Sequence, residues 1–143
     1  MLRKARGLFG EVKWNAPGGK LLLGENPSSG VVREMFEETE LTLSELDFHG
    51  ILNFYLGESK ELHQTVFVFS CRKFAGKKRR GREGGLKWFP IREIPYDSMW
   101  DDDRMWLPLL LQGESFIGDF YFTDSYREFL GHKIQPCKSF QKP

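Results

Sequence analysis

Three glutamates and an arginine lie close together in one short stretch of the chain: Arg33, Glu34, Glu37 and Glu38. On a helix, which turns about 100° per residue, the three carboxylates occupy roughly a third of the circumference or less. Carboxylates this close repel one another unless a cation lies among them, and hard oxygen ligands suit Mg²⁺ or Mn²⁺. Arg33 lies one turn before Glu37, so its guanidinium is expected to hold a carboxylate by a fork of hydrogen bonds. The spacing predicts a divalent cation site on one helical face.

The residues around these glutamates predict a helix that follows a loop. Asn26 is a suitable N-cap, and Pro27 suits the first helical position. The helix is expected to run from Pro27 to about Thr39, after a loop from Gly18 to Glu25. Apolar residues gather on the face opposite the glutamates, so one face is expected to pack and the other to be acidic.

An acidic helix face is more often a solvated surface than a metal site. Here, however, the glutamates belong to a longer pattern with set offsets. Gly19 is followed by five residues and Glu25, then by seven residues and Arg33, and Leu41 closes the stretch. The surface interpretation is rejected because all of these residue types occur at their required positions.

The stretch from Gly19 to Leu41 resembles the Nudix box, the metal-binding loop and helix of hydrolases that cleave nucleoside diphosphates linked to another group. Every defining position agrees except one, where Glu40 replaces the glycine that ends the helix in that family. Glycine enters the left-handed backbone region without a Cβ clash, so glutamate is expected to cost about 1 kcal/mol or to end the helix differently. We expect a changed cap and retained chemistry.

The resemblance implies roles for the residues of this stretch. The expected metal is Mg²⁺, with Mn²⁺ as a substitute, and Glu34 is also a candidate base. The implied metal ligands are Glu34, Glu37, Glu38 and the Gly18 carbonyl, while Arg33 and Glu25 brace the helix. Glu83, in a glycine-rich loop before Trp88, matches a position where related enzymes often carry a further metal-binding or basic carboxylate.

The composition bounds the class of protein. A chain of 143 residues with 40% hydrophobic content supports one domain, expected to span residues 1–143. The net charge of +1 gives no overall field for nucleic acid. A basic run from Lys77 to Arg82 lacks interleaved aromatic residues, so we expect a solvated hairpin tip and no stable nucleic acid binding.

The chain shows neither a stretch long and apolar enough for a membrane helix nor a signal-peptide core. Cys71 and Cys137 lack metal spacing and the density of a disulfide scaffold, so reduced thiols are expected. We therefore expect a cytoplasmic protein without membrane contact.

Strand and helix patterns alternate and predict an α+β fold, which the resemblance specifies as an α/β/α sandwich around a mixed sheet. Val66 to Phe69 is apolar on both faces, which favours a central strand covered by helices on each side. Pro108 lies inside the second expected helix, which is therefore kinked or begins later. The expected strands are Phe48–Leu56, Gln64–Phe74, Leu86–Ile91 and Phe116–Thr123, and the second helix is Asp103–Gln112.

Residues Met1 to Arg6 read as the end of a strand, although Nudix domains usually carry another strand before this point. Either the chain starts late or its sheet has one strand fewer and exposes an edge. An exposed edge favours association, so a monomer or a homodimer is expected.

Beyond the box, the chain resembles the MutT group, especially the oxidised-purine nucleoside triphosphatases of animal type. Three segments carry this resemblance: Lys13–Gly19, Trp88–Pro95 and Met99–Leu111, the last being the most specific. In such relatives a tryptophan stacks on the purine, an asparagine and an acidic pair bind the base edge, and an aromatic side chain closes the pocket. The matching residues are Trp100, Asn15, Asp102 with Asp103, and Phe54.

This pocket assignment has an alternative from the residues alone. Trp100 and Phe54 are also typical of an ordinary core, and the acidic run Asp101–Asp103 is typical of a solvated helix N-terminus. Asp101 stands where the relatives often have proline, so the base preference stays open. Two adjacent Asp residues in an apolar pocket can read more than one purine tautomer, if one is protonated and the other ionised.

The resemblance implies an enzyme that hydrolyses purine nucleoside triphosphates such as 8-oxo-dGTP to the monophosphate and pyrophosphate, for sanitation of the nucleotide pool. Two alternatives remain. One is a Nudix hydrolase of another substrate class, such as dinucleoside polyphosphates, nucleotide sugars or capped RNA. The other is a non-catalytic nucleotide-binding module, which is disfavoured because every acidic metal position is filled.

Overall fold

Two long antiparallel strands form the centre of the fold. The computed structural model describes residues 2–4, 13–77 and 87–138. β3 (Thr42–Leu56) pairs along its length with β4 (Glu61–Ala75), and the turn between them carries Gly57 and Lys60 at positive φ. Both strands extend beyond the predicted ranges Phe48–Leu56 and Gln64–Phe74.

The sheet is mixed. Its order is β4-β3-β5-β6, with β5 at Phe116–Phe122 and β6 at Phe129–Pro136. β3 and β5 run parallel, whereas the other neighbours are antiparallel. The prediction of an α+β fold around a mixed sheet is confirmed.

A second, two-stranded sheet lies near the N-terminus. β1 (Leu2–Lys4) pairs antiparallel with β2 (Lys13–Asn15), and the predicted end of a strand within residues 1–6 is therefore confirmed. Strand β2 was not predicted, because three residues are too few to show an alternating pattern.

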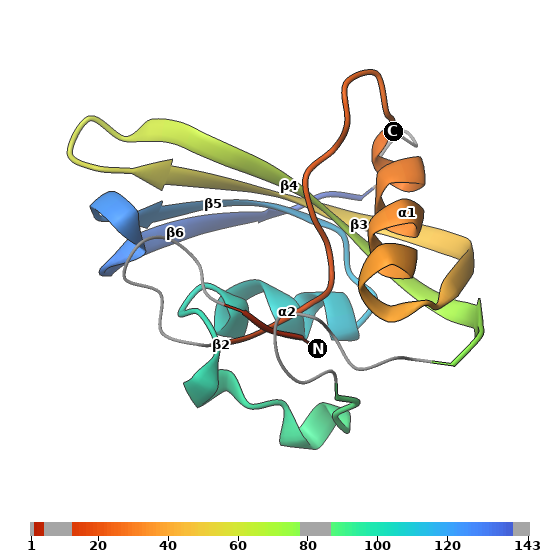
Figure 1. Cartoon of the computed structure of the whole chain (residues 1–143). Coiled ribbons are helices and arrows are strands. Elements are labelled where there is room, and N and C mark those ends of the chain that lie inside the picture. The colour runs from red at the N-terminus through yellow and green to blue at the C-terminus, as the bar shows by residue number, and fades with distance from the viewer. Residues whose placement is uncertain (1, 5–12, 78–86, 139–143) are drawn as a thin grey trace.

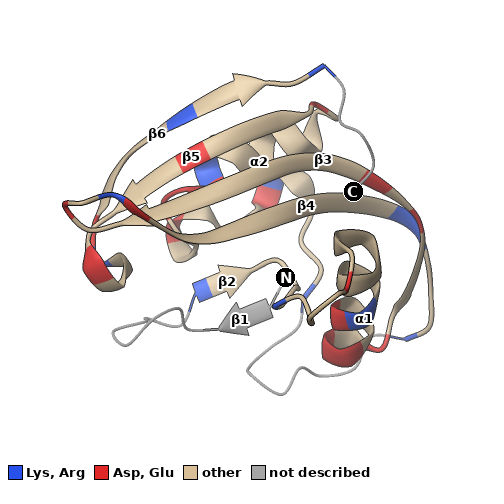
Figure 2. Ribbon diagram, turned by 90° about the horizontal axis from the view of Figure 1, so that it is seen from above, with Lys and Arg blue, Asp and Glu red and all other residues tan. Residues whose placement is uncertain are grey.

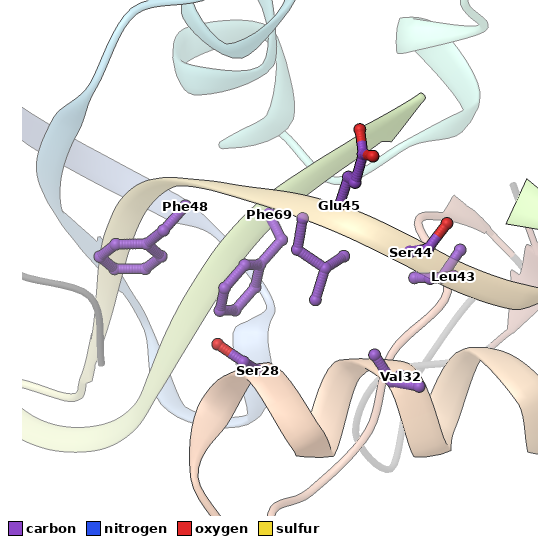
Figure 3. Close-up of a pocket in the computed structure, with 8 residues that line it drawn as sticks. Ser28, Val32, Leu43, Ser44, Glu45, Phe48 and Phe69 are labelled. Atoms are coloured by element: carbon purple, nitrogen blue, oxygen red, sulfur yellow. The ribbon is translucent and has the colours of Figure 1, made fainter. Parts of the chain in front are cut away.

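The two α-helices cover opposite faces of the large sheet. α2 (Asp103–Leu111) lies below the sheet in Figure 1, on the face that carries the buried core residues Leu52, Phe116 and Phe120. The Trp106 ring of α2 lies 6.3 Å from the Phe116 ring. α1 (Pro27–Thr39) contacts the other face, where Ser28 and Val32 line a pocket of 260 Å³ together with Phe48 and Phe69 (Figure 3).

The position of β4 differs from the prediction. Among the described residues, β4 pairs only with β3 and ends the order of the sheet, so the prediction that Val66 to Phe69 forms a central strand is wrong. Val66 and Val68 face the core between the sheet and α2, and the alternate residues Phe67 and Phe69 contact Phe48 on the α1 side. Apolar residues on both faces of this strand reflect the layers above and below it, not the number of neighbouring strands.

One other predicted strand is wrong, and one strand of the sheet was not predicted. The segment Leu86–Ile91 was expected to be a strand, but residues 87–90 have no regular structure and a short 3₁₀ helix, η1 (Ile91–Glu93), follows. Pro90 lacks the N–H that a sheet ladder requires. β6 was missed because its exposed residues are largely polar, as in FLGHKIQP.

α2 agrees with the prediction within one residue, and it begins at Asp103 although Pro108 lies inside it. A later start, one of the two expected alternatives, is therefore wrong. Two further 3₁₀ helices are present: η2 (Tyr96–Ser98) precedes α2 in the chain, and η3 (Asp124–Tyr126) follows β5. Neither α-helix combines the length and apolar character needed to cross a bilayer.

α1 begins and ends as its sequence predicts. The Asn26 side chain accepts a hydrogen bond from Ser29 N at 2.8 Å, and Pro27 is the first helical residue. The helix ends at Thr39, whose hydroxyl donates to Met35 O and accepts from Leu41 N. Glu40 then adopts the left-handed conformation, with φ 63° and ψ 14°. The glutamate therefore takes the backbone conformation that glycine prefers, and the helix does not end differently.

We expect Glu40→Gly to raise the free energy of unfolding by about 1 kcal/mol, because glycine has no Cβ to clash in the left-handed region. Urea unfolding followed by circular dichroism measures this change. Glu40→Ala is the control, since it removes the carboxylate but keeps the Cβ. Equal stabilisation in both variants would contradict the backbone explanation.

Candidate functional site

Arg33 joins the loop before α1 to the acidic face of the helix. Its Nε and Nη2 atoms donate to the two carboxylate oxygens of Glu25 at 2.8 and 2.9 Å, and Nη2 also donates to Lys20 O. Its Nη1 atom lies 2.8 Å from Glu34 and 3.1 Å from Glu37. Figure 2 shows this juxtaposition of basic and acidic residues on α1. These are the contacts that a residue bracing the helix requires.

Glu25 is fixed from both sides. One carboxylate oxygen also accepts a hydrogen bond from Leu22 N at 3.0 Å, so the side chain ties its own loop together. The hydrogen bonds from Arg33, and then the one from Leu22, lower the pKa of Glu25 to about 2. Glu25 and Glu34 in turn raise the pKa of Arg33. The pair is therefore ionised across the ordinary pH range.

The carboxylates of Glu38 and Glu34 approach the adjacent glycines Gly18 and Gly19, one each. Glu38 accepts a hydrogen bond from Gly18 N at 3.0 Å. Glu34 lies against Gly19 so closely that a Cβ there would be 2.2 Å from Glu34 Oε2. Glu37, whose side chain is 57% exposed, stands at the rim. The predicted metal-binding residues are therefore on one side of α1, facing the loop before it.

The oxygen atoms on the acidic face of α1 are of the chemical type that binds a divalent cation. In the described part of the chain, no three Asp, Glu, His or Cys side chains are already placed to hold an ion, and Glu34 and Glu37 contact Arg33 instead. The carboxylates of Glu34, Glu37 and Glu38 are hard oxygen donors, and two of them meet at the Gly18–Gly19 backbone. A cation that binds here would need the exposed Glu37 side chain to turn towards Glu34 and Glu38.

Gly30 is a residue of this site that the sequence did not single out. It lies inside α1, where glycine costs about 1 kcal/mol relative to alanine. A Cβ at Gly30 would lie 2.2 Å from Leu21 Cδ2 and 3.2 Å from Glu25 Oε1. The glycine therefore lets the loop that carries Glu25 lie directly on the helix.

Asp102 and Asp103 are buried at the start of α2. They are 1% and 2% exposed, whereas Asp101 is exposed. Asp102 accepts a hydrogen bond from Trp106 Nε1 at 3.0 Å, and Asp103 accepts one from Trp100 N at 3.2 Å. The alternative of a solvated helix N-terminus is therefore wrong for these two carboxylates. Burial and the negative charge of Asp103 also raise the pKa of the Tyr96 phenol.

Trp100 and Phe54 belong to the buried aromatic cluster at this end of the sheet. Both contact the ring of Tyr126, at centroid distances of 5.9 and 6.4 Å. Lys13 Nζ of β2 lies 5.6 Å from the centre of the Trp100 ring, which places β2 beside Trp100. Core packing is thus part of their role, and their predicted contact with a base stays a prediction.

The two halves of the site are joined by the chain itself. Asn15, predicted to bind the base edge, is the half-buried last residue of β2, and Gly18 follows three positions later. The short segment from β2 to Gly18 therefore limits the distance between Trp100 and the acidic face of α1. Lys13 and Tyr126 were predicted neither as metal-binding nor as base-binding residues. Lys13 belongs to the segment before the box that carries the resemblance, whereas no sequence feature distinguishes Tyr126.

Glu83 lies outside the described residues, as does most of the basic run from Lys77 to Arg82. The three histidines lie on strands: His49 on β3, His63 on β4 and His132 on β6.

Comparisons with known proteins give a consistent result. A family model described as the NUDIX domain matches residues 1–110. The oxidized purine nucleoside triphosphate hydrolase of Mus musculus is 36% identical over 137 residues, which cover 96% of this chain and 86% of that protein. The protein of the same name from Danio rerio is 38% identical over 132 residues, covering 92% and 78%. A solved structure of a mutator MutT protein from Bacillus halodurans superimposes with a TM-score of 0.80 at 27% identity, covering 93% and 86%.

We expect Gly19→Ala to displace the Glu34 carboxylate, because the new methyl group would occupy its position. Metal-dependent turnover should fall more than about tenfold while the protein stays folded, since a small misplacement at such a site is costly. Gly18→Ala is the matched control, because a Cβ there meets nothing within 4 Å. Equal losses in the two variants would contradict the steric explanation.

The lowered pKa of Glu25 predicts a pH-dependent part of the stability. A carboxyl with a pKa of about 2 in the folded protein and about 4.5 in the unfolded chain stabilises fully above pH 4.5 and loses this effect as the pH falls towards 2. Urea unfolding of the wild type and Glu25→Gln at pH 2 to 6 should therefore give curves that converge at low pH.

Glu45→Gln serves as the control for this experiment. Its ion pair with Lys73 has both side chains about two-thirds exposed, and such surface pairs contribute little. If the wild type and Glu25→Gln differed by the same amount at every pH, the Arg33 pairing would not be the cause.

Proposed function

Since the chain belongs to the NUDIX family, we propose that it hydrolyses oxidised purine nucleoside triphosphates, such as 8-oxo-dGTP, to the monophosphate and pyrophosphate. The observation that carries this proposal is the Arg33 network, in which one guanidinium braces Glu25 and contacts Glu34 and Glu37. Relatives that cover most of the chain and bear the corresponding name support the substrate class.

The acidic face of α1 is proposed to hold the cation that the family requires, with Mg²⁺ as the ion and Mn²⁺ as a substitute. When bound, a divalent cation neutralises phosphate charge and activates water. Glu34, Glu37 and Glu38 would hold it with the Gly18 carbonyl. Glu34, whose side chain is 16% exposed and ion-paired with Arg33, is the proposed base and would orient water or accept its proton.

The residues around Trp100 are proposed to recognise the base. An aromatic face binds any purine, while buried carboxylates and an amide read the donors and acceptors on its edge. Asp102 and Asp103 are held in place by Trp106 Nε1 and Trp100 N, so their oxygens are fixed before the base arrives. Such fixed polar groups discriminate strongly, because a mismatched base leaves them without hydrogen bonds.

Turnover of a nucleotide panel tests the proposal. With Mg²⁺, the wild type should release pyrophosphate from oxidised purine triphosphates with a higher kcat/KM than from unmodified purine triphosphates, dinucleoside polyphosphates, nucleotide sugars or capped RNA. Glu38→Gln should lower kcat by at least about a hundredfold, because a cation ligand is lost. Its fold should be intact by circular dichroism.

Glu45→Gln, which neutralises a glutamate that pairs with Lys73 and not with Arg33, is the control and should keep the wild-type rate. A wild-type rate in Glu38→Gln would exclude the metal-binding assignment. Higher turnover of one of the other nucleotide classes would identify that class as the substrate. Binding without any turnover would indicate a non-catalytic module.

A further inference from the structure

Tyr126 connects the two aromatic residues proposed to hold the base. It ends η3, is 7% exposed, and presents its ring at steep angles to Trp100 and Phe54, 68° and 63°. It also contacts Phe122 at 5.2 Å. Edge-to-face contacts of this kind fix the orientation of both partner rings. A change at Tyr126 is therefore transmitted to Trp100 and Phe54 directly.

The backbone at Tyr126 is held in a conformation that bulky residues avoid. Ser125 and Tyr126 have φ values of 60° and 59°, in the left-handed region. Glycine or asparagine is usual there, and strained positions of this kind persist only where the surrounding structure imposes them. Here Tyr126 N donates to Thr123 O, and the Thr123 hydroxyl accepts from Glu128 N at 2.8 Å. The turn therefore directs the tyrosine ring inwards at a conformational cost.

His63 holds the other end of Tyr126. Its Nδ1 atom lies 2.7 Å from the Tyr126 hydroxyl oxygen, and the two rings meet at 73°. The register of β3 with β4 changes from Phe54 opposite Gln64 to Tyr55 opposite Leu62, so His63 is the extra residue of a β-bulge. Bulges often redirect a side chain beside a functional site. The irregularity in β4 and the strained turn after β5 thus meet at one hydrogen bond.

We propose that Tyr126 is a positioning residue of the base pocket, that His63 holds it in place, and that the pair sets which purine the pocket accepts. This inference rests on the function proposed above. Trp100 contacts Lys13, over its ring, and Tyr126, at a steep angle between the rings, while its backbone N–H donates to Asp103. A displaced Trp100 ring would carry the stacked base out of line with Asp102 and Asp103, which discriminate between bases by their positions.

Steady-state kinetics of Tyr126→Phe, His63→Ala and the double variant test the proposal. Each single variant should raise KM for the preferred purine triphosphate about fivefold, the effect of one lost hydrogen bond. The ratio of kcat/KM between oxidised and unmodified purines should change, while kcat stays within about twofold because the acidic face of α1 is untouched. The double variant should be no worse than either single variant, because both remove the same bond.

His132→Ala is the matched control. His132 is also an exposed strand histidine that stacks on aromatic rings, Phe120 and Phe129, but it does not contact Tyr126 through any hydrogen bond that we observe. This variant should keep the wild-type base preference. Thermal unfolding of all variants separates positioning from stability, since a structural role would lower kcat for every substrate together with Tm.

The outcomes are distinct. If the wild type is active and Tyr126→Phe and His63→Ala keep its KM and base preference, the positioning role alone is overturned. Additive effects in the double variant, or a uniform fall in kcat with Tm, overturn it as well. A wild type that hydrolyses no purine triphosphate of the panel overturns the proposed function and this inference together.

Discussion

The ion pair between Arg33 and Glu25 is the interaction on which the rest of the candidate site depends. Three glutamates on one side of a helix repel one another, and the guanidinium of Arg33 lies among them at 2.8 Å from Glu34 and 3.1 Å from Glu37. Its remaining donors hold Glu25 and Lys20 O of the loop. One positive charge therefore relieves the repulsion on the helix and fastens the loop that carries Gly18 and Gly19.

The loop matters because it connects the two parts of the site. β2 ends at Asn15 beside Trp100, and the glycines that meet Glu34 and Glu38 follow within four residues. At one end Lys13 of β2 lies over the Trp100 ring, and at the other Gly18 N donates to Glu38 while Gly19 lies against Glu34. The separation of the aromatic cluster from the acidic face is consequently set by contacts at both ends of this short connection.

Two departures from ordinary backbone geometry show how the fold tolerates local cost. Glu40 takes a left-handed conformation in the position where glycine is usual, and the Thr39 hydroxyl completes the helix end with hydrogen bonds on both sides. Tyr126 takes the same conformation in a turn held by Thr123. Glu40 leaves the contacts of Arg33 with Glu34 and Glu37 in place, whereas Tyr126 places an aromatic ring against Trp100. Similar backbone strain therefore has different consequences, which depend on where the side chain points.

The sequence by itself determined α1, its N-cap at Asn26, its end at Thr39, its acidic face and the pairing of Arg33 with its neighbours. These features depend on residues a few positions apart, whose relation is set by helical geometry. Only the tertiary structure decided that β4 ends the described sheet, that Gly19 gives room to the Glu34 carboxylate, and that His63 meets Tyr126, 63 positions away along the chain. Such contacts arise from the packing of distant segments, and neither composition nor periodicity specifies which side chains will meet there.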